Sequence, residues 1–131
     1  MNRISWMSLL SVVALLTVQA SFASERVGNF ALLDHEGSYH QLRKYGDSKA
    51  VVIISIASAC VENIDKLPKY RLLRTTWEQQ GITFLGLNSS VEDEQDDVRL
   101  MDALHNFDIP ILLDKSQLVA ENLGISKAGE V

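Results

Sequence analysis

The sequence of 131 residues has a single cysteine, Cys60, and only two prolines. One thiol cannot form a disulfide within its own chain, so in an oxidising compartment Cys60 is free, capped or paired with another molecule. The chain also lacks a glycine-rich phosphate-binding loop and any low-complexity tract. Its net charge is −5, which argues against a nucleic-acid partner because phosphate binding requires a positive surface.

The first 23 residues have the layout of a secretory signal peptide. Arg3 supplies a cationic start, an apolar run follows from Ile4 to Val18, and the small residues Ser21 and Ala23 precede a predicted cleavage site. The apolar run is shorter than the ~20 residues that a membrane-spanning helix needs. We therefore predict cleavage after Ala23, no membrane association afterwards, and a mature domain over residues 24–131 that is exported to the periplasm or beyond.

The remaining sequence alternates between strand and helix patterns. The runs 50–57 and 82–88 are continuous and apolar, which is typical of strands buried on both faces of a parallel sheet. The other predicted elements are a β-hairpin over 30–34 and 38–41, a short extended piece over 109–114, and helices over 61–80, 89–108 and 115–124. This alternation predicts an α/β fold with a parallel or mixed sheet.

Helical spacing predicts which side chains are buried. The first long helix has an apolar stripe of Leu67, Tyr70, Leu73 and Trp77, and the second has Val98, Met101, Leu104 and Phe107. Arg71 and Arg74 are expected to be solvated. The acidic run 92–97 is interpreted as a solvated helix start, because it lacks the glycine and the final glutamate of a calcium loop.

Cys60 lies between a predicted buried strand and a predicted helix. The unpaired amides and the dipole of a helix N-terminus favour the thiolate and lower a thiol pKa. From position alone two interpretations stay open: a reactive Cys60, or the small buried hydrophobic residue that most lone cysteines are. No general base is identified, because the adjacent Glu62 would raise a thiol pKa.

The stretch "CVENIDKLP", in which Pro68 follows Cys60 by eight residues, resembles the thioredoxin-like redoxins of the AhpC/TSA and thiol–disulfide oxidoreductase group. The resemblance covers nearly all of residues 27–131, including "NFALLDHEGSYHQLRKYGDSKAVVIIS", "GITFLGLNSS" and "IPILLDKSQLVAENLGISKAGEV". It is strongest to exported redoxin domains at the front of larger proteins. It implies a thioredoxin-like fold: a central mixed sheet flanked by helices, preceded by a β-hairpin. It also implies that the family's last strands and helix are missing after Val131, with further domains of a longer parent protein as partners.

The departures from the redoxin pattern define the expected chemistry. Asn63 stands where dithiol members have their second cysteine, Val61 replaces the usual proline, and Ala59 replaces the usual tryptophan. Gly129 takes the place of the cis-proline that faces the thiol in this family. Dithiol exchange requires a resolving thiol. The resemblance therefore implies catalysis by Cys60 alone, with an external thiol or a protein disulfide as partner and without a cofactor or metal.

Other functions stay open at this stage. The lost second cysteine and cis-proline are also compatible with a non-catalytic interaction module of a larger assembly. A peroxiredoxin-like peroxidase would carry proline and threonine or serine where this chain has Ile53 and Ala57. A copper site like that of the copper chaperones of this fold would combine Cys60 with His35 and His40, but it needs a second cysteine. Both histidines are expected on the hairpin surface.

Overall fold

The computed structural model describes residues 27–59 and 61–131. The predicted signal peptide, residues 1–23, and Cys60 itself lie outside the described residues. The elements in chain order are β1 (Ala31–Leu33), β2 (Tyr39–Gln41), the 3-10 turn η1 (Leu42–Tyr45), β3 (Ala50–Ser55), α1 (Val61–Trp77), η2 (Glu78–Gln80), β4 (Ile82–Asn88), α2 (Gln95–His105), β5 (Ile111–Leu113) and α3 (Leu118–Asn122).

The sheet combines parallel and antiparallel pairing, as the resemblance implied. β3, β4 and β5 form a parallel sheet with β4 in the centre, and β1 and β2 form a separate antiparallel hairpin. An isolated antiparallel bridge between Asp34 and Leu112 joins the hairpin to β5. Strand–helix–strand connections of this kind place the carboxyl ends of β3 and β4 at the same edge.

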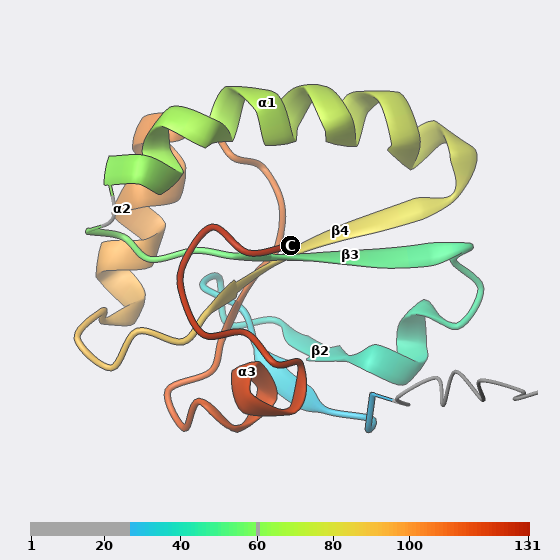
Figure 1. Ribbon diagram of the computed structural model, residues 1–131, viewed down its shortest axis with the longest axis horizontal. Coiled ribbons are helices and arrows are strands. Elements are labelled where there is room, and N and C mark those ends of the chain that lie inside the picture. Colours follow the sequence, from blue (N-terminus) through green and yellow to red (C-terminus); the bar gives the residue numbers. More distant parts are fainter. Residues whose placement is uncertain (1–26, 60) are drawn as a thin grey trace, which may run out of the picture.

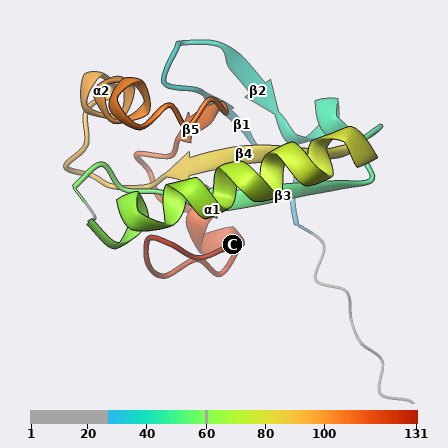
Figure 2. The ribbon, with the colours of Figure 1, turned by 90° about the horizontal axis from the view of Figure 1, so that it is seen from above.

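Helices cover both faces of the parallel sheet (Figures 1 and 2). α1 and α2 pack on one face, over a cluster that includes Ile54, Leu67 and Phe107. α3 and the hairpin cover the other face, over a cluster that includes Leu85, Leu87, Leu112 and Val119. The C-terminal loop passes along the edge of β3 that faces away from β4 (Figure 2).

Close packing at the centre of the sheet requires glycine at position 86. A Cβ atom added to Gly86 would lie 2.9 Å from Ile56 Cδ1 and 3.0 Å from Ile111 Cγ1. These isoleucines come from the strand segments on the two sides of β4. Because real Cβ atoms do not approach other carbons this closely, a larger residue would push the strands' side chains out of their rotamers.

The predicted helical faces are only partly confirmed. Leu67 is buried and Tyr70 is half-buried, but Leu73 and Trp77 are exposed. On the second helix Val98 and Met101 are buried as predicted. The prediction for Leu104 is wrong, since it is 69% exposed, whereas Phe107 is 2% exposed. Phe107 reaches the core because α2 ends at His105 and Asn106 adopts a left-handed conformation (φ 48°), which turns the chain before Phe107.

Substitutions at Leu104 and Phe107 form a matched pair that measures this difference. Phe107→Ala should lower the free energy of unfolding by about 3–5 kcal/mol, because it leaves a cavity in the core. Leu104→Ala should change it by about 0.5 kcal/mol or less, because that side chain is largely in water already. Urea denaturation of both variants checks this. Equal losses would contradict the burial seen here.

The prediction that Arg71 and Arg74 are solvated is wrong. Arg71 donates a hydrogen bond to the carbonyl of His105. Arg74 donates to the carbonyl of Asp108 and, at 2.8 Å, to its carboxylate, and its side chain is 15% exposed. Helical spacing could not reveal this, because the partners are carbonyls at the end of α2 and just after it, more than thirty residues away.

Within residues 27–59 and 61–131, no helix combines the length and the apolar character needed to cross a bilayer.

Candidate active site

The segment that leads to Cys60 is a short turn at the carboxyl end of β3. β3 ends at Ser55, a turn follows at Ser58 and Ala59, and α1 begins at Val61. The strand and turn expected before Cys60 are therefore present, and so is the helix expected after it. Cys60 itself lies outside the described residues, so its role stays a prediction.

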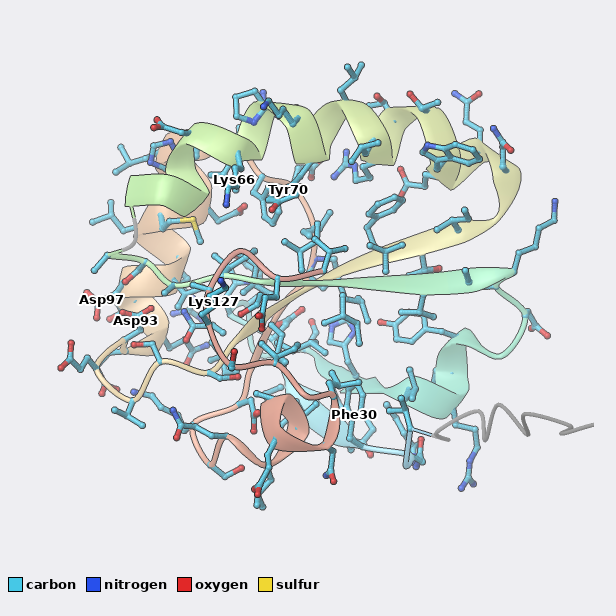
Figure 3. The ribbon with its side chains drawn as sticks, viewed as in Figure 1. Phe30, Lys66, Tyr70, Asp93, Asp97 and Lys127 are labelled. Carbon is cyan, nitrogen blue, oxygen red and sulfur yellow. The ribbon has the colours of Figure 1, made fainter. Side chains whose placement is uncertain are left out.

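Asp93, from the loop between β4 and α2, holds this turn in place. Its carboxylate accepts hydrogen bonds from the Ser58 backbone N–H at 2.8 Å and from the Ser58 hydroxyl at 2.5 Å. It also accepts one from the Asn88 side-chain amide at 2.6 Å. Asp93 is only 6% exposed, and it is labelled in Figure 3 beside the N-terminal end of α2. The prediction of a fully solvated acidic run is therefore wrong at this residue.

Hydrogen bonding keeps the Asp93 carboxylate ionised. Burial alone would raise the pKa of Asp93, but the hydrogen bonds from the Ser58 hydroxyl and N–H, and from Asn88, hold it below its ordinary value of 3.8. The turn before Cys60 is thus held by the buried, negatively charged Asp93 carboxylate, which accepts hydrogen bonds from Ser58 and Asn88. Sequence analysis missed Asp93 and Ser58. The available signal was an acidic residue a few positions after the end of a buried strand.

Gly129 lies in the loop that docks against the end of β3. Its N–H donates to the Ser55 carbonyl at 2.8 Å, and the Ser55 N–H donates to the Glu130 carbonyl at 2.8 Å. The Tyr70 hydroxyl reaches the Gly129 carbonyl from α1 at 3.4 Å. Gly129 has φ +89°, a conformation that favours glycine. The structure therefore brings Gly129 to the strand that leads to Cys60, and its place opposite the Cys60 thiol stays a prediction.

The other predicted surroundings of the site lie along the start of α1. Ala59 is an exposed residue of the turn, Val61 is the first residue of α1, and Asn63 lies in its first turn. Pro68 is within α1 and exposed to solvent. Pro68 therefore stands two helical turns beyond the start of α1.

The hairpin histidines are not free surface side chains, so that expectation is wrong. His35 is 3% exposed. Its Nδ1 accepts a hydrogen bond from the Ile111 N–H at 3.2 Å, and its carbonyl accepts from the side chains of Gln95 and Arg99. His35 thus joins the hairpin to β5 and α2.

His40 belongs to a polar chain on the same hairpin. Its Nε2 lies 2.7 Å from the Asp34 carboxylate, and its Nδ1 is hydrogen bonded to the Tyr45 hydroxyl. Burial would raise the pKa of Asp34, but hydrogen bonds from the Ser38 N–H and from His40 lower it below 3.8. Burial, followed by the Asp34 charge, raises the pKa of Tyr45. The hydrogen bonds that join Asp34, His40 and Tyr45 therefore hold the hairpin in its conformation, and the raised pKa of Tyr45 keeps its hydroxyl protonated.

In the described part of the chain, no group of three histidine, aspartate or glutamate side chains is arranged to hold a metal ion. Both ring nitrogens of His40 have hydrogen-bond partners. His35 is bonded through Nδ1 alone, and its buried Nε2 lies 3.4 Å from the Asp102 carboxylate without a hydrogen bond.

The fold and the placement of the turn define a class of protein. A parallel β3–β4–β5 sheet with helices on both faces, and a hairpin before it, is the thioredoxin-like arrangement. The sequence model of the AhpC/TSA family matches residues 23–130. The chain belongs to the AhpC/TSA family.

Solved structures confirm the thioredoxin-like fold. A hypothetical protein of Sinorhizobium meliloti aligns with a TM-score of 0.69 at 24% identity, over 76% of this chain and 57% of that one. A thiol:disulfide interchange protein DsbE from Chlorobium tepidum gives 0.64 at 15% identity, over 77% and 69%. The peroxidoxin BcpB of Mycobacterium tuberculosis gives 0.66 at 20% identity, over 78% and 65%.

The chain thus spans between about half and 70% of the length of these three proteins. A comparison with curated proteins found no match.

Proposed function

We propose that this chain is an exported monothiol redoxin in which Cys60 carries out thiol–disulfide exchange and an external thiol completes the cycle. The observation that carries the proposal is the turn fixed by Asp93 between β3 and α1. Asp93 fixes Ser58, two residues before Cys60, and α1, a helix of 17 residues, begins directly after Cys60, where a thiolate would meet the helix N-terminus. Such a position stabilises a thiolate.

Family membership supports this chemistry, and the sequence limits it to one thiol. The Chlorobium protein of the same fold is a thiol:disulfide interchange protein. Asn63 occupies the place of a resolving cysteine, so a mixed disulfide at Cys60 must be released by another molecule. The signal-peptide pattern of residues 1–23 supports export of the domain over residues 24–131.

Alkylation of the purified protein across a range of pH tests the proposal. We expect the rate to follow a thiol pKa below the ordinary value of about 8.5. Reduction of insulin by the protein with an external thiol should be lost in Cys60→Ser. A Cys60 pKa at or above about 8.5, or equal insulin reduction by the variant, would contradict a redox role.

A non-catalytic interaction module is the second candidate. One observation favours it: Leu72, Leu73 and Trp77 of α1 are exposed by 69%, 48% and 42%, which leaves apolar surface available for a partner. No insulin reduction by the unaltered chain, together with partner binding that survives Cys60→Ser, would favour this module. A peroxidase is a third reading, and the family's peroxidoxin neighbour supports it. This reading predicts that Cys60 catalyses the reduction of hydrogen peroxide.

A further inference from the structure

A cavity of about 490 Å³ opens at the carboxyl ends of β3 and β4. Its walls are the end of β3, the loop after β4, the start of α3 and the C-terminal loop. The volume is in the range of small-molecule sites, ~300–1,000 Å³. Ligands of open α/β sheets commonly bind at the carboxyl ends of the strands.

Ser55 brings a hydroxyl group to the wall of this cavity. The residue is only 6% exposed. Its backbone is paired with Gly129 and Glu130, and its hydroxyl has no hydrogen bond to any side chain or backbone group among the residues that the structure describes. A molecule bound in the cavity can therefore form a hydrogen bond with this hydroxyl.

Two other hydroxyls present oxygen lone pairs to the cavity. Ser89 donates its proton to the Asp114 carboxylate at 3.2 Å, and Ser116 donates to the same carboxylate at 3.1 Å. Once its single proton is committed, a hydroxyl can only accept further hydrogen bonds. This part of the wall therefore suits a hydrogen-bond donor such as an ammonium group.

The cavity is also lined by one cation and one anion. Lys127 comes from the C-terminal loop, where Figure 3 labels it, and Glu121 from α3. In the described part of the chain neither side chain belongs to an ion pair. Two opposite charges on one wall suit a zwitterion better than a simple anion, which the net charge of −5 would repel.

We propose that this cavity binds a low-molecular-weight thiol bearing an α-amino-acid group, and that this thiol is the external partner of Cys60. Its carboxylate pairs with Lys127, and its ammonium group faces Glu121 and the serine oxygens. Ala57 lines the cavity and precedes Cys60 by three residues, a stretch of chain that spans at most roughly 11 Å. The role of the bound thiol rests on the proposed redox function of Cys60.

The reaction balances with two small thiols for each protein disulfide. The Cys60 thiolate attacks one substrate sulfur, forming a mixed disulfide and releasing the other sulfur as a thiolate. The bound thiol, as its thiolate, attacks the Cys60 sulfur and releases the second substrate thiolate. A second small thiol then attacks the small-molecule sulfur, which regenerates the Cys60 thiolate. The protein disulfide gains two electrons, and the small thiols leave as their disulfide.

Binding is measured on the full chain carrying Cys60→Ser, with S-methylcysteine as an unreactive zwitterionic probe. Calorimetry should show saturable binding, which Lys127→Ala and Glu121→Ala each weaken at least fivefold, and which Ser55→Ala also weakens. Lys69→Ala and Glu92→Ala replace exposed charges outside the cavity and serve as matched controls that leave binding unchanged. The uncharged 2-(methylthio)ethanol should not bind.

The outcomes separate the site from the redox function. No saturable binding of S-methylcysteine, or equal binding by the cavity and control variants, would overturn the site, whatever the pKa of Cys60. If binding follows the predicted pattern but the unaltered protein reduces insulin no faster with cysteine than with 2-mercaptoethanol, the role of the bound thiol as partner of Cys60 is overturned.

Discussion

The Asn63→Cys protein should form a disulfide within the chain and gain catalytic insulin reduction. Position 63 lies in the first turn of α1, three residues after Cys60, and residues three apart on a helix face each other. The introduced thiol would attack the Cys60 sulfur of a mixed disulfide and release the substrate without an external thiol. We expect insulin reduction to rise by about tenfold or more, on the order of 1.4 kcal/mol in transition-state free energy.

Thiol titration before and after oxidation measures the first part of this prediction, and insulin turbidity measures the second. Glu62→Cys is the matched control, because it adds a thiol at a spacing that does not face Cys60 on a helix. Oxidised Asn63→Cys protein that still has two free thiols, or a gain that Glu62→Cys shares, would show that Cys60 is not half of a dithiol site.

Asp93→Ala should cost about 3 kcal/mol of the free energy of unfolding. The substitution removes the acceptor of the Ser58 N–H, the Ser58 hydroxyl and the Asn88 amide, and hydrogen bonds to a charged group are worth ~1.5–3 kcal/mol each before repacking or solvation of the donors. Urea denaturation measures the loss. Glu92→Ala, at the exposed preceding residue, is the control and should change stability by about 0.5 kcal/mol or less.

The contribution of Asp93 to the free energy of unfolding also depends on pH, and the direction of the pKa shift decides whether it falls in acid or in base. The folded pKa lies below the ordinary value of 3.8, so the unfolded chain binds the proton more readily. The stabilisation is therefore fully present above that value and is lost as pH falls through the folded pKa. Asp93→Asn should therefore lose less stability than the unaltered protein as pH falls from about 4 through the folded pKa of Asp93. Parallel acid curves for both proteins would exclude Asp93 as the titrating group.

The α/β fold could be predicted because each core element carries its own local signal. β3 and β4 are continuous apolar runs, which is the pattern of strands covered on both faces, and Gly81 ends the first helical segment with φ +86° as a C-terminal glycine does. The hairpin turn at Glu36–Gly37 was likewise predicted from its own residues. Each of these features depends on residues within one element, so neighbouring sequence was sufficient.

The candidate site was less predictable because its contacts join distant segments. Asp93 resembles its acidic neighbours in sequence, and only the approach of Ser58, 35 residues away, makes it a buried partner. His35 similarly pairs with Ile111, 76 residues away. Ser55 was a candidate for neither packing nor binding, since a single serine at the end of an apolar run has no periodic signal. For Asp93 and His35, tertiary contacts overrode local polarity.

The guanidinium groups of Arg71 and Arg74 have a consequence for how the molecule opens. They connect the second half of α1 to the last residue of α2, His105, and to Asp108 just after it. Fluctuations that separate α2 from the sheet must therefore also break contacts of α1. We expect amide protons near the end of α2 and in the middle of α1 to open as one cooperative unit, with a common free energy of opening measured by hydrogen exchange.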